Sequence, residues 1–261
     1  MSRSIVLSYS QVDLFERCPR LWSYLYIKNR TVPADPNLEF GKAVHFAIAQ
    51  ALSDDDYQHD RYFTEHPVSQ ALVNAMVKSS LDYVHNLGFL CHIEIEKMLP
   101  EGNAEDLGFR GILDVLGVDA NGDYHVFDWK TSSREYTKHD VLTSQQLTAY
   151  AYLLWAVKGI IPKTVRFCVL DKNFGNLTEY TSNRFYSDIV FWKNKLDVVR
   201  SAIENDIIVG NPNNCIKKYG RKTEVCYFYE DCWHSEPRLF LVKHNLELPI
   251  IGTGRTSTGA R

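Results

Sequence analysis

The amino-acid sequence predicts a mixed α/β fold, in which a central mixed β-sheet is flanked by helices. Apolar residues recur with a helical period up to about residue 87. From Cys91 the period changes to two, which is typical of strands, and after Ser144 helical and strand patterns alternate again. This interleaving argues against an all-α or an all-β architecture.

Three helices are expected before the sheet. The first covers 10–27 and carries Cys18 on its buried stripe, the second covers 38–52, and the third covers 68–87. Two further helices are expected at 144–158 and 185–205.

Five strands are expected. Two cysteines, Cys91 and Cys168, lie inside their apolar runs and are interpreted as small buried residues. The strand ranges are 92–99, 109–118, 124–131, 164–170 and 177–181.

The second and third strands carry acidic residues whose relative position depends on the turn between them. The turn, 119–123, contains Asn121-Gly122. A two-residue loop would put Asp114 and Asp128 on opposite faces of the sheet, whereas a three-residue loop with Gly122 left-handed would place them opposite each other. A shared metal site therefore requires the three-residue loop or an equivalent bulge.

Two carboxylates on adjacent strands can hold a hard divalent cation such as Mg²⁺. Strand alternation puts Asp128 and Lys130 on one face and Trp129 on the other. An ammonium beside a metal-bound water can orient that water and neutralise charge on a phosphate. By contrast, Glu94 and Glu96 on the preceding strand are expected to form a solvated face, although one of them could approach the metal through water.

Net charge and the length of the apolar runs exclude some classes of protein. The chain has 261 residues, a net charge of −3 and a pI near 6.3, which argues against coating duplex nucleic acid with a broad basic surface. No apolar run reaches the roughly 18 residues of a membrane span, so we expect a cytosolic protein without a membrane partner. In a reducing compartment, clustered thiols more often bind metal than form disulfides.

In order along the chain, these motifs resemble the PD-(D/E)XK nuclease superfamily, in particular RecB-like nuclease domains such as the CRISPR-associated exonucleases. The resemblance implies a restriction-endonuclease-like core and covers most of the chain. The segments that carry it are Ser8–Pro19, Gly41–His45, Gly111–Asp114, Asp128–Lys130 and Gln146–Tyr150.

The resemblance also implies roles for individual residues. Mg²⁺ or Mn²⁺ would be bound by His45, Asp114, Asp128 and the backbone carbonyl of Trp129. The catalytic set would be completed by Lys130, which positions the attacking water. Support for the DNA backbone or the site would come from Gln146 and Tyr150, which project from one face of a helix.

Four cysteines match those that hold a 4Fe-4S cluster in one branch of the family, namely Cys18, Cys215, Cys226 and Cys232. Thiolates favour iron–sulfur clusters or zinc. Ten residues separate Cys215 from Cys226 where the family has two, so Cys215 departs most from the pattern. Zinc, or cysteines that are unligated or disulfide-paired, are the alternatives.

The resemblance leads us to expect a deoxyribonuclease, an exonuclease acting on single-stranded DNA or DNA ends, in the cytosol of a bacterium or a phage-infected cell. A single domain over 1–251 would contain a catalytic core at about 38–182, with 10–27 and 206–235 around the cluster, and 252–261 would be a disordered tail. Recombination, repair or CRISPR proteins are the expected partners. The alternatives are an idle nucleic-acid-binding or recombination-partner subunit and an iron–sulfur redox protein.

Overall fold

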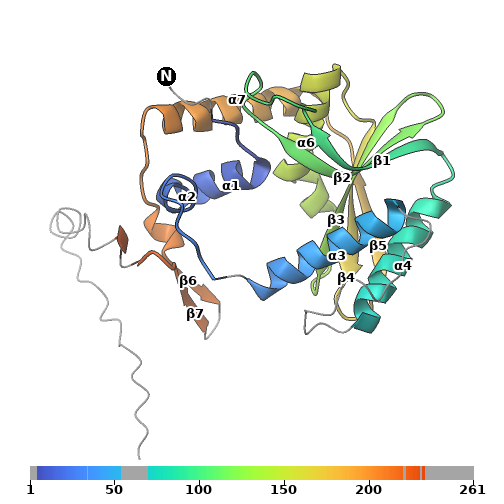
Figure 1. The fold of residues 1–261 in the computed structure, drawn as a ribbon, viewed down its shortest axis with the longest axis horizontal. Helices are drawn as coiled ribbons and strands as arrows, with labels where there is room; N and C mark the ends of the chain where they lie inside the picture. Colours follow the sequence, from blue (N-terminus) through green and yellow to red (C-terminus); the bar gives the residue numbers. More distant parts are fainter. Residues whose placement is uncertain (1–4, 34, 54–69, 220–221, 230, 233–261) are drawn as a thin grey trace, which may run out of the picture. The chain divides into compact units, whose positions relative to one another are not determined.

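A computed structural model describes most of the chain, and it divides into two compact units. The first comprises 1–16 and 31–207, and the second comprises 17–30 and 208–261. The single domain over 1–251 stays a prediction, and the expected tail lies outside the described residues. The described residues are 5–33, 35–53, 70–219, 222–229 and 231–232 (Figure 1).

The first unit is built around a five-stranded sheet in which the strands follow chain order. All neighbouring pairs are antiparallel except β3 and β4, which are parallel and joined by helices, so the sheet is mixed as predicted. The strands are β1 (Leu90–Leu99), β2 (Gly111–Asp119), β3 (Tyr124–Ser132), β4 (Thr164–Asp171) and β5 (Leu177–Ser182).

Helices cover both faces of this sheet (Figure 1). On one face lie α3 (Pro36–Ser53) and α4 (Gln70–Asn86). On the other lies α6 (Gln145–Lys158), which follows the short α5 (Lys138–Leu142) and packs against α7 (Tyr186–Glu204). The predicted fold class is confirmed.

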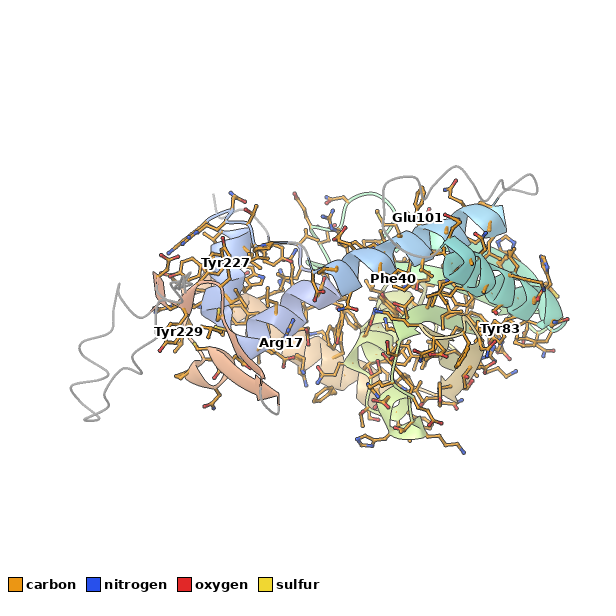
Figure 2. The ribbon with its side chains drawn as sticks, turned by 90° about the horizontal axis from the view of Figure 1, so that it is seen from below. Arg17, Phe40, Tyr83, Glu101, Tyr227 and Tyr229 are labelled. Carbon is orange, nitrogen blue, oxygen red and sulfur yellow. The ribbon has the colours of Figure 1, made fainter. Side chains whose placement is uncertain are left out.

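Large apolar side chains fill the space between the sheet and the α3–α4 pair. The buried side chains of Phe127 and Trp129 point to this face from β3, and the ring of Tyr83 on α4 meets both edge-on. Figure 2 labels Tyr83 and Phe40, the partly buried aromatic residues that α4 and α3 contribute to this core. Because side chains alternate along a strand, Asp128 between them points to the opposite face.

The hairpin between β2 and β3 has the three-residue loop that a shared metal site requires. The register pairs Val115 with Phe127 and Val118 with Tyr124, and Gly122 has φ +81°. Continued by one residue, this register places Asp114 opposite Asp128. The geometric condition for two carboxylates on one face is confirmed.

The prediction of one helix over 10–27 is wrong, because the segment forms α1 (Tyr9–Arg17) and α2 (Pro19–Tyr26). Between them Cys18 is extended, with φ −164° and ψ 101°. Pro19 explains the break, since a residue before proline is pushed out of the α region and proline is favoured at the first helical position.

The two isolated cysteines behave differently. Cys168 on β4 is fully buried, as predicted. Cys91 is exposed, which corrects the prediction, because it lies on edge strand β1 where the pairing register shifts between Leu90 and His92. No disulfide involves any of the six cysteines.

The second unit contains α2, a single 3₁₀ turn at Pro212–Asn214, and a small hairpin of β6 (Ile216–Tyr219) and β7 (Lys222–Val225). The rings of Tyr24 and Phe228 pack 4.7 Å apart, close to the two tyrosines labelled Tyr227 and Tyr229 in Figure 2. The sequence analysis missed this hairpin.

Membrane spans were sought among the described helices, and none of these helices is long and apolar enough to cross a bilayer.

The left-handed loop position predicts the effect of a substitution. Gly122→Ala should lower the free energy of unfolding by about 1 kcal/mol, because an L-residue at positive φ is strained. Gly88→Ala is the matched control, since an added Cβ meets nothing within 4 Å at either glycine and only Gly122 has positive φ. Urea unfolding measures the difference; equal losses in both variants would contradict the strain argument.

Candidate active site

The first unit contains a pocket of about 570 Å³ between α3 and strands β1 to β3. Three of the predicted site residues line it, namely His45, Asp114 and Lys130. Its other lining residues are Asn37, Leu38, Gly41, Lys42, Phe46, Ala49, Gln50, Glu96, Ile112 and Thr131.

Asp114 connects β2 to both β3 and α3. One of its carboxylate oxygens, Oδ2, accepts a hydrogen bond from the backbone N–H of Trp129 at 2.7 Å and lies 3.3 Å from Nδ1 of His45. Asp114 is 8% exposed, so this carboxylate is held by a strand neighbour while remaining at the pocket wall.

Asp128 is buried more deeply, with 1% of its surface exposed. Its Oδ1 accepts a hydrogen bond from Nε2 of Gln146 at 2.9 Å, and its Oδ2 lies 2.5 Å from Nζ of Lys130. That ion pair is the contact that compensates the charge on Oδ2. The ammonium also lies 5.2 Å from the centre of the Phe167 ring, a cation–π contact.

Gln146 and Tyr150 complete this network from α6. The amide of Gln146 accepts from Lys130 Nζ at 2.9 Å and donates to the hydroxyl of Tyr150 at 2.8 Å. The predicted site residues therefore form two sets of contacts, which the backbone of Trp129 joins. One set is His45 and Asp114, and the other is Asp128, Lys130, Gln146 and Tyr150. Their catalytic roles stay predictions.

Burial and neighbouring charges shift the pKa values of the site residues. Desolvation raises the pKa of Asp128 to about 6, against the opposing effect of the Lys130 ammonium. Burial lowers the pKa of Lys130, but the carboxylate of Asp128 outweighs it, so the pKa stays above its usual value and the amine stays charged. In the same way, Asp114 outweighs desolvation at His45 and raises the pKa of the imidazole.

Glu96 is a pocket residue that the sequence analysis placed on a solvated face. It lies on β1 between Ile95 and Lys97, whose partners are Val115 and Leu113, so the register puts Glu96 opposite Asp114. Burial and the nearby Asp114 charge raise its pKa. Its φ of +49° is unusual for a glutamate in a strand. The pairing of β1 with β2, which sequence spacing does not give, was the missing signal.

Arg184 is a second residue that sequence reasoning missed. Its buried guanidinium donates to the carbonyls of Val141 and Ser144 at 2.9 and 3.0 Å and to the hydroxyl of Thr148 at 2.8 Å. These bonds fix the start of α6, where Gln146 lies. Gly111 lies against the other side of α6, because a Cβ there would be 2.8 Å from Cδ1 of Leu153, whose side chain would have to shift.

We next consider which side chains could bind a metal ion. In the part of the chain that the structure describes, no three His, Cys, Asp or Glu side chains are grouped so that they could hold an ion. The donor chemistry nevertheless suits a hard cation, because the carboxylates of Asp114, Asp128 and Glu96 supply oxygen donors. Lys130 neutralises the Asp128 carboxylate at present.

Comparison with protein families agrees with this geometry. The family model described as the PD-(D/E)XK nuclease superfamily matches residues 6–174, which include all six residues of the network. The chain belongs to the PD-(D/E)XK nuclease superfamily. No curated protein matches this sequence.

Two solved structures are similar to this chain. A candidate exonuclease from Eubacterium rectale aligns with a TM-score of 0.50 and 11% identity, over 98% of this chain and 94% of the other. LHK-Exo, an alkaline exonuclease from Laribacter hongkongensis, aligns in its dAMP complex with a TM-score of 0.46 and 10% identity, over 77% of this chain and 89% of the other. At such identities the likeness concerns the fold alone.

The buried pair of Asp128 and Lys130 predicts that replacing Lys130 destabilises the metal-free protein by an amount that depends on pH. Lys130→Ala leaves the Asp128 carboxylate unpaired, which raises its pKa further above about 6. Folding then favours the protonated acid, so stability present at low pH is lost as the pH rises from the ordinary pKa of 3.8 toward the raised pKa of the variant. The unchanged protein shares this loss only up to about pH 6, so the difference between the two proteins develops above that pH. We expect a loss of about 3 kcal/mol near pH 8 and a smaller loss near pH 5.

Urea unfolding in EDTA at both pH values measures this effect. Lys78→Ala is the control, because Lys78 pairs with Asp82 on an exposed part of α4 and should have little effect at either pH. A loss from Lys130→Ala that does not depend on pH would rule out the unpaired Asp128 charge as its cause.

Proposed function

We propose that this protein is a metal-dependent deoxyribonuclease, an exonuclease that acts on single-stranded DNA or DNA ends. One observation carries the proposal: Asp114 and Asp128 come directly beyond the last paired residues of β2 and β3, with the ammonium of Lys130 beside the second carboxylate. This is the arrangement that a cation, a water and a phosphate can share at one point.

Mg²⁺ or Mn²⁺ would be held by His45, Asp114, Asp128 and the backbone carbonyl of Trp129. When bound, such a cation lowers the pKa of a coordinated water and polarises the phosphate. The fit is supported by the oxygen-rich donor set and by the buried Oδ2 of Asp128. Glu96, opposite Asp114, adds a further carboxylate to the pocket wall.

The protein's own residues would divide the remaining work. Because the pKa of Lys130 is raised, its side chain keeps its proton and acts as a hydrogen-bond donor to the attacking water or the phosphate. Gln146 holds Lys130 and Asp128 at fixed positions through its amide. The pKa of Tyr150 is raised well above its usual value by burial, so its hydroxyl stays neutral and can support the site or the DNA backbone.

A 4Fe-4S cluster in the second unit is the structural part of this proposal, with zinc as the alternative. The β6–β7 hairpin accounts for the long spacing between Cys215 and Cys226, because the Cys226 N–H donates to the Cys215 carbonyl at 2.7 Å where the hairpin closes. The backbone of Asn211 connects two of the cysteines. Its N–H donates to the sulfur of Cys18, and its carbonyl accepts from the thiol of Cys215. Burial raises the pKa of Cys232, and the charges of Cys226 and Cys215 add to it.

The nuclease is tested with Asp114→Asn. The amide oxygen of asparagine can still accept from the Trp129 N–H, so the strands should keep their register while the charge is lost. We expect cleavage of end-labelled single-stranded DNA in Mg²⁺ or Mn²⁺ to fall at least about 100-fold, because several kcal/mol of charge stabilisation depend on the metal. The label also reports polarity, and duplex DNA measures strand preference.

Asp82→Asn, on the exposed surface of α4, is the matched control and should cleave normally. EDTA should abolish cleavage by the unchanged protein. Cleavage that survives both EDTA and Asp114→Asn would overturn the metal mechanism. DNA binding without cleavage in any metal would favour the idle binding subunit.

The cluster is tested by iron and sulfide analysis of anaerobically purified protein. We expect about four iron atoms per chain and visible charge-transfer absorbance, both lost in Cys226→Ser. Cys91→Ser, at an exposed position on β1, should keep the full iron content. Protein with zinc in place of iron would favour the alternative, and protein without either metal would contradict the cluster.

A further inference from the structure

The ammonium of Lys130 lies against an aromatic ring from the neighbouring strand. Its Nζ is 5.2 Å from the centre of the Phe167 ring. Phe167 is 5% exposed, and the parallel register of β3 and β4 pairs it with Asp128. Because Cys168 packs in the core between the sheet and the α3–α4 pair, strand alternation turns Phe167 to the opposite face, where Lys130 lies.

The Phe167 ring is itself held by the chain that follows β3. The ring of Tyr136 packs edge-on against it, with the ring centroids 5.8 Å apart and the planes at 85°. The guanidinium of Arg134 lies 4.4 Å from the centre of the Tyr136 ring and pairs with Asp140 of α5. The packing therefore continues from the ammonium to α5, and the buried ring offers Lys130 a fixed surface.

Three described groups contact the ammonium, and they differ in their other partners. Asp128 is a proposed metal ligand, so a bound cation and Lys130 would compete for its carboxylate. Gln146 shares its amide between Lys130 and two other side chains. The ring of Phe167 is apolar and buried, so it competes for neither metal nor DNA. Its attraction for a cation strengthens as water is excluded, and only 23% of the Lys130 side chain is exposed.

We propose that Phe167 is a positioning residue for the nuclease reaction, whose ring holds the Lys130 ammonium at the acidic centre without neutralising its charge. The inference rests on the proposed nuclease function and deepens it, because it names a side chain that keeps Lys130 in place for the reaction. A carboxylate offsets the charge of an ammonium, whereas a ring face attracts the cation through its quadrupole. Lys130 therefore keeps its charge for the attacking water or the phosphate. Phe167 is buried, so it would act only through Lys130.

The contact is tested first without metal or DNA. Urea unfolding in EDTA gives the unfolding constants of the unchanged protein, Phe167→Leu, Lys130→Met and the double variant. The substitutions keep apolar volume but remove the ring face and the charge. In the presence of Lys130, Phe167→Leu should raise the unfolding constant roughly 2- to 30-fold more than it does in the Lys130→Met background, which is the range of a cation–π pair.

The second measurement separates positioning from substrate binding. In Mg²⁺, Phe167→Leu should lower kcat on single-stranded DNA roughly 2- to 30-fold and leave KM within about twofold, because the lost contact holds Lys130 and not the substrate. Phe167→Tyr keeps the ring face and should restore most of kcat. Phe109→Leu is the matched control, since Phe109 is fully buried against the rings of Tyr152 and Trp192, and it should leave kcat unchanged.

The outcomes distinguish the positioning role from the nuclease. If Phe167→Leu changes the unfolding constant equally with and without Lys130, the positioning role is overturned, while cleavage by the unchanged protein keeps the nuclease. A loss of kcat that Phe109→Leu shares, or that Phe167→Tyr does not restore, overturns it as well. If the unchanged protein does not cleave DNA, the proposed function fails and the role of Phe167 in it fails too. A coupled pair with a selective, restored loss of kcat supports the proposal.

Discussion

The carboxylate of Asp128 is the group on which the site depends. Burying a charge costs several kcal/mol unless close partners compensate, and Asp128 is 1% exposed. Lys130 supplies the opposite charge from the same face of β3, and Gln146 supplies a hydrogen bond from α6. The second partner exists only because α6 crosses this face of the sheet, where Arg184 anchors its first turn. The long-range packing of α6 and the local chemistry of β3 are therefore coupled.

The parts of this arrangement that depend on local chemistry could be predicted from sequence. Asn121-Gly122 permits a left-handed residue, and the requirement that Asp114 and Asp128 share a face selected the three-residue loop that the structure contains. Strand alternation likewise separated Trp129 from its two neighbours. Alternation needs only adjacent residues, whereas the turn residues allowed two loop lengths and the expected metal site chose between them.

The parts that depend on distant contacts could not be predicted. Glu96 enters the pocket because β1 pairs with β2 in a particular register, and Arg184 reaches α6 across more than 30 residues of chain. The closure of Cys215 onto Cys226 depends on a hairpin that the alternation pattern did not reveal. The break at Cys18 is different, because Pro19 is a local signal that was outweighed by the apolar stripe.

Charge balance links the metal to the substrate in the proposed function. Glu96, Asp114 and Asp128 bring three acidic groups to one pocket region, whereas Lys130 is the cation beside Asp128 and the imidazole of His45 lies beside Asp114. A phosphate approaching this centre without a metal would meet carboxylates that repel it. A divalent cation would reverse the sign of that interaction, so metal and DNA phosphate should each increase the affinity for the other.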